Sequence, residues 1–368
     1  MNIYRYAVML LTLGVIAIAG CARGDAPGRA ARSELRLMTI NVWSGLDYRG
    51  TLSMGEYEAE EVREKRFHAL VAEIRRLDPD VIGINEANML PDYAEKLARE
   101  TGFDCLYHVG VSGIRVWRAG LPWNLREGDA ILAKKDLSLA FVGREQLSGG
   151  GFVWNNLSFH TEDATQALLG KIRVNGEDVY IAATHWHYSA FDDARSRELL
   201  ARLKREGKYP DRATGEALSQ LAADARWRRD EAERMYSFLE EHVPSGCKLF
   251  VMGDLNATAD LPEVRRFLSG GFTDTFAAVS KGPGYTWDAV NNSNIRKYYL
   301  DAPRRAFDSL YDELNSANDG RSVRIDFILA GRAVSRGAIA GSFLCCTGYY
   351  DGVQPSDHFG VFSVIRMK

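Results

Sequence analysis

Six short apolar runs in this sequence end, or are interrupted, at polar side chains of the kinds that bind cations and phosphates. Apolar runs of about four to eight residues are typical of strands buried in a sheet. A polar residue at the end of such a strand lies where the strand reaches the surface. The runs and their polar residues are 35–40 with Asn41, 81–84 with Asn85 and Glu86, 179–183 with Thr184 and His185, 249–252 with Asp254 and Asn256, 323–329 around Asp326, and 359–365 behind Asp357 and His358.

Amphipathic helices and a hairpin separate some of these runs. Apolar residues at i, i+3, i+4 and i+7 between Phe67 and Leu77 predict a helix that stops at residues 78–80. Residues 227–242 predict a second helix. The strand pattern of residues 171–183 alternates around Asn175-Gly176, the dipeptide that most favours a two-residue hairpin turn. This mixed order predicts an α+β fold in which sheets pack together and helices cover the outside.

The composition excludes several classes of protein and limits how an anionic partner could be bound. The chain has 368 residues, of which 46% are apolar, so it can bury a full core and is not a disordered, collagen-like or low-complexity protein. Its 46 Lys and Arg residues against 49 Asp and Glu residues leave a net charge of −3. No global basic field can steer an anionic partner, so a local patch or a bound cation must hold it. The arginine pairs Arg228-Arg229 and Arg265-Arg266 lie in helical stretches and are interpreted as solvated helix faces.

The N-terminal segment predicts export and a lipid anchor. Residues 4–20 form an apolar run of about 15 residues, short for a membrane span, behind the single cation Arg5. The run ends in Ile18-Ala19-Gly20-Cys21, which resembles the lipobox of bacterial lipoproteins, where the thiol after the cleavage site carries the lipid. The alternative is an uncleaved anchor or a buried first helix.

These features predict three regions, of which only the last is a folded domain. Residues 1–20 are a lipoprotein signal peptide, 21–33 a tether and 34–368 one catalytic domain, since no repeat or linker divides the body. We expect an exported, membrane-anchored monomer; Ala22 after the anchor would favour the outer membrane in a Gram-negative host. Cys105, Cys247, Cys345 and Cys346 give no clear disulfide framework and are expected to be buried thiols.

Eight of the polar residues at the strand ends form a set that suits phosphate-ester chemistry. Any one of them has an ordinary explanation, which is that the strand reaches water at that point. Together they supply four carboxylates, two carboxamides and two imidazoles. Mg²⁺ prefers oxygen ligands and needs only one or two protein carboxylates, which leaves the imidazoles free to bind phosphate oxygens or move protons. The eight are Asn41, Glu86, His185, Asp254, Asn256, Asp326, Asp357 and His358.

The segments that carry these residues resemble the endonuclease/exonuclease/phosphatase superfamily, which has the deoxyribonuclease I-like fold. The resemblance spans about residues 35–366, and its pieces occur in family order. It implies a four-layer α/β/β/α sandwich of two packed, mostly antiparallel sheets flanked by helices, and a Mg²⁺ cofactor for which Mn²⁺ can substitute. The pieces are residues 38–43, 80–86, 128–132, 183–185, 253–256, 324–329 and 356–358.

The resemblance also implies a role for each of the eight residues. Glu86 is the principal Mg²⁺ ligand, and Asn41 and Asp357 complete or support the metal site. His185 contacts the phosphate and protonates the leaving oxygen, while Asn256 holds a phosphoryl oxygen. Asp254 orients or deprotonates the attacking water. Asp326 fixes the tautomer of His358, which serves as base or donor; whether Asp254 or His358 takes the proton stays open.

Four further features receive weaker assignments. His187 and Trp287 are candidate substrate contacts, although each could equally be a surface or packing residue. Asn85 and Asp129 stand where many relatives carry Gln and Asn, which the family pattern tolerates. The polar stretch 288–323 is expected to shape substrate choice.

The expected activity is that of a metal-dependent phosphohydrolase, first of all a phosphodiesterase, that cleaves a phosphate ester by in-line attack of an activated water. The alternatives are a secreted nuclease, a sphingomyelinase-like lipid phosphodiesterase, and a phosphomonoesterase for sugar or inositol phosphates. A binding module that has lost the chemistry ranks last, because none of the eight residues is missing. Aromatic candidates for a lipid interface are Phe152, Trp154, Tyr349 and Tyr350, and candidates for a cationic pocket are Arg115, Arg118, Arg126, Arg304 and Arg305.

Overall fold

The computed structural model describes residues 31–160, 162–302 and 307–367. The chain divides into two units, Met1–Ala31 and Arg32–Lys368, and all of the folded structure described below belongs to the second unit. The expected signal peptide, the lipidation site Cys21 and most of the expected tether lie outside the described residues. None of the described helices combines the length and the apolarity that a membrane span requires.

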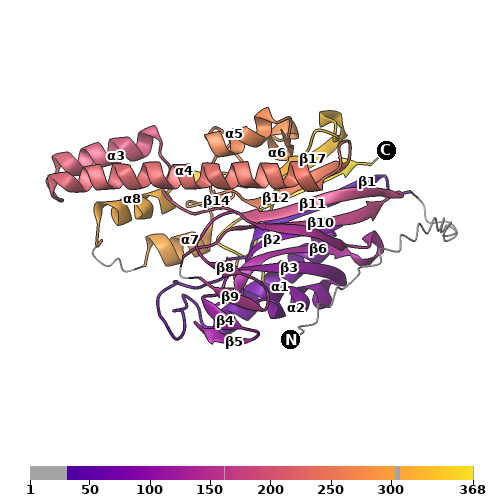
Figure 1. Ribbon diagram of the computed structural model, residues 1–368, viewed down its shortest axis with the longest axis horizontal. Helices are drawn as coiled ribbons and strands as arrows, with labels where there is room; N and C mark the ends of the chain where they lie inside the picture. Colours follow the sequence, from indigo (N-terminus) through magenta and orange to yellow (C-terminus); the bar gives the residue numbers. More distant parts are fainter. Residues whose placement is uncertain (1–30, 161, 303–306, 368) are drawn as a thin grey trace, which may run out of the picture. The chain divides into compact units, whose positions relative to one another are not determined.

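Two six-stranded sheets form the centre of the fold (Figure 1). In each sheet one pair of strands is parallel, β1 with β2 and β11 with β12, and the remaining pairs are antiparallel. The first sheet has the order β17 (Ile339–Cys345), β18 (Gly360–Arg366), β1 (Glu34–Asn41), β2 (Val81–Ala87), β6 (Glu127–Lys134) and β3 (Phe103–Val111). The second has the order β13 (Thr273–Asp274), β16 (Asp326–Ala330), β12 (Lys248–Asp254), β11 (Glu177–His185), β10 (Gln166–Val174) and β7 (Ala140–Gln146).

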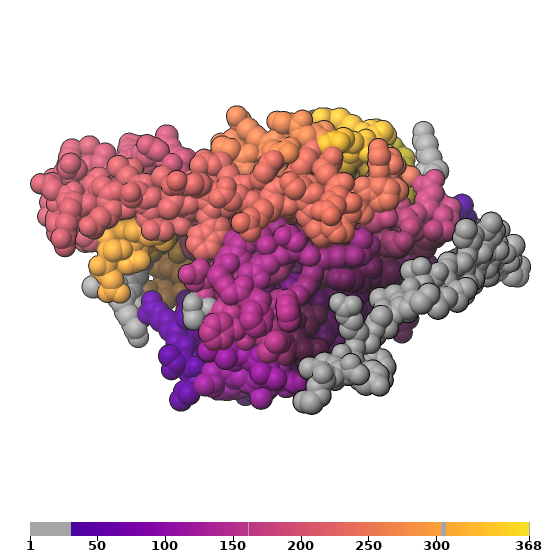
Figure 2. All heavy atoms as spheres, viewed as in Figure 1, coloured from indigo at the N-terminus to yellow at the C-terminus, as the bar shows by residue number. Residues whose placement is uncertain are grey.

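Side chains on alternate strand positions fill two different cores. On β1, Leu35 and Leu37 join the core between the two sheets, whereas Met38 and Ile40 join the core beneath α1 (Glu60–Leu77) and α2 (Asp92–Thr101). The outer face of the second sheet packs against α4 (Asp211–His242) and α5 (Pro262–Ser269), and α4 covers the upper part of the face seen in Figure 2. Because both faces are buried, the strands read as continuous apolar runs. The expected α/β/β/α sandwich is confirmed.

The helices and the hairpin expected from the sequence are present. The helix predicted between Phe67 and Leu77 is the second half of α1, which ends at Asp78 in the left-handed conformation (φ 51°). Residues 227–242 are the second half of the 32-residue helix α4. Asn175 and Gly176 form the turn between β10 and β11 with φ values of 51° and 82°. Cys105, Cys247, Cys345 and Cys346 are free thiols; Cys345 and Cys346 are buried as expected, whereas Cys105 and Cys247 are only partly buried.

Two smaller parts have no counterpart in the sequence prediction. The first half of α4 packs with α3 (Ala194–Arg205) and α8 (Leu310–Asp319) around a separate apolar cluster. A four-stranded small sheet has the order β5 (Ala119–Leu121), β4 (Ile114–Val116), β9 (Leu157–Phe159) and β8 (Phe152–Val153). The remaining elements are η1 (Lys135–Leu137), α6 (Thr275–Val279), β14 (Trp287–Asp288), α7 (Ser293–Ile295), the π-helical turn η2 (Arg296–Leu300), β15 (Ser322–Val323) and η3 (Arg336–Ala338).

One arginine that the sequence places on a solvated helix face is buried in the core. Arg228 on α4 has 0% exposed surface, whereas its neighbour Arg229 is exposed, so the interpretation was wrong for Arg228. Its Nε donates to Oε1 of Glu263 on α5 at 3.0 Å, and its Nη1 donates to Ser189. The side chain of Arg228 therefore joins α4 to α5 and to the loop after β11.

We expect Arg228→Ala to cost about 3–5 kcal/mol of unfolding free energy, because it leaves the Glu263 carboxylate buried without its partner. The double variant Arg228→Met/Glu263→Leu should recover most of this loss, since it removes both charges. Arg229→Ala is the matched control and should change stability by no more than about 0.5 kcal/mol. Urea unfolding followed by circular dichroism measures all three; equal costs for Arg228→Ala and Arg229→Ala would contradict the account.

Candidate active site

Strand register brings the polar strand ends together at one rim of the sandwich. In the second sheet, His185 pairs with Asp254 across β11 and β12, and Asp254 pairs with Asp326 across β12 and β16. These three residues therefore lie in one row. In the first sheet, Asn41 of β1 pairs with Asn85 of β2. Of the eight residues expected to form a site, all lie at this rim.

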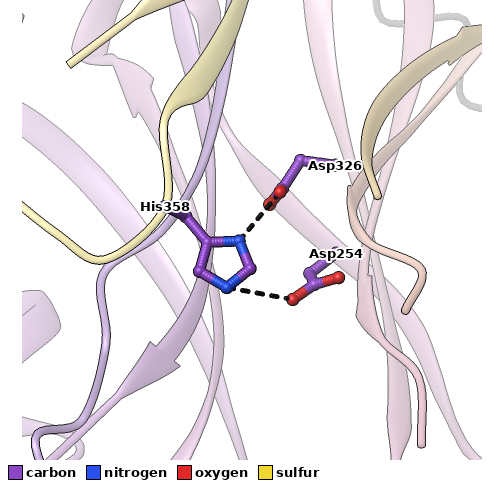
Figure 3. A group of neighbouring side chains, drawn as sticks. All are labelled: Asp254, Asp326 and His358. Carbon is purple, nitrogen blue, oxygen red and sulfur yellow. Dashed lines mark hydrogen bonds and ion pairs between the residues drawn. The ribbon is translucent and has the colours of Figure 1, made fainter. Parts of the chain in front are cut away.

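Asp254, Asp326 and His358 form a buried group from three segments (Figure 3). Nδ1 of His358 lies 2.9 Å from Oδ2 of Asp326, and its Nε2 lies 3.7 Å from Oδ2 of Asp254. Burial alone would lower the pKa of the His358 imidazole, but the carboxylates of Asp326 and Asp254 outweigh it and raise that pKa well above its usual value. Burial and the charge of Asp326 raise the pKa of Asp254 to about 6. His358 is thus held as a cation between two acids.

Glu86 and Asn41 occupy the adjacent side of the rim. The pairing of β2 with β6 shifts register between Ile84 and Ala87, and Glu86 takes a left-handed φ of 55° at this bulge. Such a conformation is unfavourable for glutamate and marks a residue that its surroundings hold in place. Nδ2 of Asn41 donates to Oε1 of Glu86 at 2.8 Å and to Oδ2 of Asp254 at 3.1 Å. Asn41 therefore bridges one carboxylate from each sheet.

Asp357 is the fourth carboxylate of the acidic group at the rim. Tyr299 Oη donates to its Oδ2 at 3.1 Å, and Ser356 Oγ donates to its Oδ1 at 3.1 Å. Burial raises the pKa of Asp357 to about 7, and the charge of Glu86 adds to this against the opposing effect of His358. Oδ1 of Asp326 is buried without a hydrogen-bond partner among the described residues. Crowded carboxylates with an unpartnered oxygen are the donor set that a hard divalent cation requires, so the residues fit Mg²⁺.

Two placements for a cation follow from the geometry. Glu86, with Asn41 and Asp357 beside it, is the expected set. Asp254, Asp326 and His358 also offer ligand atoms that lie within 4.8 Å of one another. In this second set Nδ1 of His358 is already bonded to Asp326, so binding a cation there would break an existing ion pair.

His185 and Asn256 face the carboxylates from the end of β11. Nδ2 of Asn256 lies 3.0 Å from Nε2 of His185, and Nε2 lies 3.8 Å from Oε1 of Glu86 and 3.7 Å from Oδ2 of Asp254. Nε2 can accept a hydrogen bond from Asn256 only when the His185 ring is neutral. Burial alone would lower the pKa of His185, but Asp254 and Glu86 raise it to about 9. Protonation would therefore turn Nε2 into a donor directed at an anion.

Asn85 holds the two sheets together at the site, a role that its sequence position does not reveal. Its Nδ2 donates to Asp129 Oδ1 at 2.7 Å and to the Thr184 carbonyl at 2.9 Å, and its Oδ1 accepts from the Asp254 backbone N–H at 3.0 Å. Asn85 is fully buried. Gly253 permits this close approach, because at its φ of 148° a Cβ atom would lie 1.9 Å from the Thr184 carbonyl oxygen.

Thr286 supports the Asp326 end of the row. Its Oγ1 accepts the backbone N–H groups of Ile325 and Asp326, each at 3.1 Å. The sequence analysis named only the neighbouring Trp287, and no role was expected for Thr286. A buried hydroxyl beside a family-like Asp strand is the signal that points to this role.

Within the stretch 288–323, residues of the turn η2 pack over the Asp357 side of the site. Rings of Tyr298 and Tyr299 from η2 lie 5.1 Å and 6.3 Å from the ring of Trp43, which follows β1. Tyr57 lies 6.0 Å from Tyr298 and 5.9 Å from Tyr299. These aromatic side chains form a wall next to the carboxylates, in the position that the predicted influence on substrate choice requires.

The two candidate substrate contacts lie behind the site. The ring of His187 stacks on Trp227 of α4 at 4.2 Å, with Nε2 3.2 Å from Oδ1 of Asp224. The ring of Trp287 is 9% exposed and packs edge-on against His358 at 5.1 Å, and its Nε1 donates to the Asp319 carbonyl. In this arrangement the ring of His187 packs against α4, and the ring of Trp287 packs against a residue of the site.

Known proteins have this fold, and their similarity to this chain extends over most of its residues. The model of the Endonuclease/Exonuclease/phosphatase family matches residues 38–358. Among curated proteins, none matches the chain. Among solved structures, an endonuclease/exonuclease/phosphatase from Bacteroides vulgatus is similar with a TM-score of 0.55 and 12% identity, covering 92% of this chain and 100% of its own. TDP2 from D. rerio, solved with a single-strand DNA product, is similar with a TM-score of 0.52 and 17% identity, covering 91% and 100%.

The ion pairs of His187 predict a stability that depends on pH. Burial alone would lower the pKa of His187, but its ion pairs with Asp163 at 3.8 Å and Asp224 at 3.2 Å raise it to about 9. The unfolded value is about 6.5, so this stabilisation is complete below about pH 6.5 and is lost as the pH rises through about 9. His187→Gln should therefore lose about 1–2 kcal/mol more at pH 6 than at pH 10, a modest value because Asp163 is 51% exposed.

Urea unfolding at both pH values measures this difference. His68→Gln on the exposed surface of α1 is the matched control and should show no such dependence. A destabilisation by His187→Gln that is equal at pH 6 and pH 10 would contradict the ion-pair account.

Proposed function

Because the chain belongs to the endonuclease/exonuclease/phosphatase family, we propose that it is a metal-dependent phosphohydrolase, first of all a phosphodiesterase, that uses an activated water. The observation that supports this best is the convergence of four carboxylates and two imidazoles at one rim, with fewer cations than anions. A site that only bound an anion would place cations there instead. Glu86, with Asn41 and Asp357, is proposed to hold Mg²⁺, for which Mn²⁺ can substitute. The bound cation would offset charge on the phosphate.

Asp254 is the better candidate to accept the proton of the attacking water. With a pKa of about 6 it is mostly ionised at neutral pH, while its pKa is close enough to neutrality for proton transfer. His358 has a strongly raised pKa and so remains a donor at neutral pH. Asp326 fixes its ring through Nδ1, and Nε2 is left to donate toward Asp254 or a phosphate oxygen.

His185 and Asn256 are proposed to act on the phosphate group. Nε2 of His185 lies 3.0 Å from the Asn256 amide nitrogen, which is itself fixed by donation to the Trp186 carbonyl at 2.9 Å. An arriving phosphate would accept from Asn256 Nδ2 and from protonated His185, which can then pass its proton to the leaving oxygen. Such donors, preset in a buried site, stabilise charge as it develops in the transition state.

The arginines considered for a monoester pocket are used otherwise in this fold. Arg115 donates to the carbonyls of Pro122 and Leu125, and Arg126 donates to those of Trp117 and Asn155. Arg304 and Arg305 lie outside the described residues. A phosphomonoesterase that needs a cationic pocket therefore gains no support from Arg115 and Arg126.

A nuclease is the second candidate, and an arginine-lined cavity favours it. The cavity has a volume of about 360 Å³ between α3 and α8, and Arg195, Arg202, Arg205 and Arg321 line it. Single-strand DNA is the product bound by TDP2 from D. rerio, which shares this fold. A local patch of this kind could hold a nucleic-acid backbone although the net charge of the chain is negative.

The activity itself is tested with bis-(p-nitrophenyl) phosphate, DNA, RNA, sphingomyelin and inositol phosphates in the presence of Mg²⁺ or Mn²⁺. We expect turnover of at least one substrate that EDTA abolishes, and a loss of about 10³-fold or more in Glu86→Gln, because the amide cannot neutralise a cation. Glu95→Gln on the surface of α2 is the matched control and should keep full activity. Turnover that persists in EDTA or in Glu86→Gln would contradict the proposal.

The location is proposed from the N-terminal sequence. We propose that Cys21 carries a lipid after removal of residues 1–20, so that the mature protein is an exported monomer anchored to a membrane, the outer membrane in a Gram-negative host. Labelled palmitate should enter the wild type and the control Cys105→Ser but not Cys21→Ser, which should leave the membrane fraction. Equal labelling of Cys21→Ser would contradict lipidation at this residue.

A further inference from the structure

The small sheet of β4, β5, β8 and β9 has its polarity reversed. Its polar residues point inward, with Arg115 3% exposed and Ser158 2% exposed. Its apolar residues point outward, with Ile114 at 55%, Val116 at 56% and Phe159 at 56%. A strand on the surface of a water-soluble protein ordinarily shows the opposite alternation.

Hydrogen bonds on the inner face fix this orientation. The Arg115 guanidinium donates to the carbonyls of Pro122 and Leu125 at 2.6 Å and 3.0 Å. Ser158 Oγ donates to the Gly113 carbonyl at 3.0 Å and lies 2.6 Å from Ser112 Oγ. Turning the sheet over would bury apolar side chains only by breaking these bonds, so the outward apolar face is a stable feature of the fold.

The outward side chains form one continuous surface because strand register places them side by side. Ile114 pairs with Leu121 on one side and with Phe159 on the other, and Phe159 pairs with Phe152. Val116 pairs with Leu157. The small-sheet face consists of these outward residues and Ala119, and none of them is charged: Ile114, Val116, Ala119, Leu121, Phe152, Leu157 and Phe159.

Three tryptophans extend this apolar surface. Trp117 is 68% exposed at the β4–β5 turn, and its backbone N–H donates to the Asn156 carbonyl in the β8–β9 turn. Trp154, 51% exposed, lies in that second turn with its ring 5.1 Å from Phe152. Trp123 is 59% exposed, and its N–H donates to the carbonyl of Leu52, which is 68% exposed. Exposed tryptophans beside aliphatic residues are typical of surfaces that meet a lipid interface.

We propose that the small-sheet face docks on a lipid bilayer. A protein normally exposes apolar side chains singly, and a contiguous patch marks a surface that is covered in use. The absence of charge on this face suits the hydrocarbon boundary of a bilayer better than a polar partner surface. The small sheet lies on the side of the folded unit away from α4 (Figure 1), so helix α4 does not hinder this contact.

The chain outside the described fold favours a bilayer over other occupants. The folded unit begins at Arg32, whose guanidinium pairs with Asp80 and with Asp136 at 2.8 Å. The ten residues between Cys21 and Arg32 span about 35 Å at most when extended. If Cys21 is lipidated as proposed above, this tether keeps the folded unit close to a membrane, which raises the effective concentration of the bilayer around the small-sheet face.

Docking would bring the candidate active site near the bilayer, whichever phosphate ester it cleaves. The segment of residues 44–56 connects the two: its Leu52 contacts Trp123 beside the small-sheet face, and the N–H of Ser44 donates to Glu86 Oε2 at 3.3 Å. In the same segment, Tyr48 donates to Glu127 on β6. The membrane proposal stands on the surface alone and does not require the proposed activity.

Vesicle binding tests the proposal on residues 22–368, which contain the whole Arg32–Lys368 unit and lack the lipid and the apolar leader. We expect co-flotation with neutral phosphatidylcholine vesicles and quenching of tryptophan fluorescence by brominated phosphatidylcholine. Val116→Glu/Phe159→Glu should lower the vesicle partition coefficient by tenfold or more, because it places charge in the apolar boundary. If this variant proves unstable, Val116→Thr/Phe159→Thr places β-branched residues, which suit strands, at both positions and should lower binding by threefold or more.

Leu218→Glu/Val290→Glu is the matched control, since both residues are exposed apolar side chains outside the small sheet, and it should bind vesicles like the wild type. Three results would overturn the proposal. They are no binding of the wild type to phosphatidylcholine, equal binding by the small-sheet variants, or binding only to anionic vesicles that is lost in salt. A dimer that the Glu variant dissociates, without vesicle binding by the wild type, would assign the face to a second copy of the chain.

Discussion

The site depends on two asparagines that bridge the sheets where carboxylates would otherwise repel one another. Asn41 donates to Glu86 from the first sheet and Asp254 from the second, and Asn85 joins Asp129, Thr184 and Asp254 by three hydrogen bonds. Burial of ionised groups is costly unless each one is paired or hydrogen-bonded. The two asparagine amides supply some of the hydrogen bonds that the buried carboxylates need. The negative charge that remains at the rim is the reason why we propose a cation site there.

Local pattern in the sequence predicted packed sheets covered by helices, and the resemblance to the family implied the four layers. Apolar runs with polar ends identified β1, β2, β11, β12, β16 and β18, and the eight residues at those ends all lie at the rim. Their relative positions depend on strand register and on the bulge at Glu86, which no short sequence pattern encodes. The bridging role of Asn85 likewise requires knowledge of which strands face each other.

Other features were missed or misjudged because tertiary contacts override local pattern. Arg228 lies in an arginine pair that reads as solvated, yet Glu263 and Ser189 accept its hydrogen bonds in the core. The strands of the small sheet are two or three residues long, too short for any periodicity to be recognised.

Residues 44–56 connect the active site, where the N–H of Ser44 donates to Glu86, with the small-sheet face, beside which the Leu52 carbonyl accepts from the N–H of Trp123. A hydrolase whose surface docks on lipid gains access to phosphate esters at or in the bilayer, and the aromatic wall of Trp43, Tyr57, Tyr298 and Tyr299 would meet the organic part of such a substrate. Tyrosine and tryptophan combine an apolar body with a polar tip, which suits a site that opens at an interface.

The central claim is that Glu86, Asn41 and Asp357 hold a divalent cation. The most direct measurement is a crystal structure with Mn²⁺ in which anomalous scattering locates the ion. The account predicts a peak bonded to a carboxylate oxygen of Glu86 that disappears in Glu86→Gln. A peak held only by Asp254, Asp326 and His358, or no peak at the rim at saturating Mn²⁺, would contradict it.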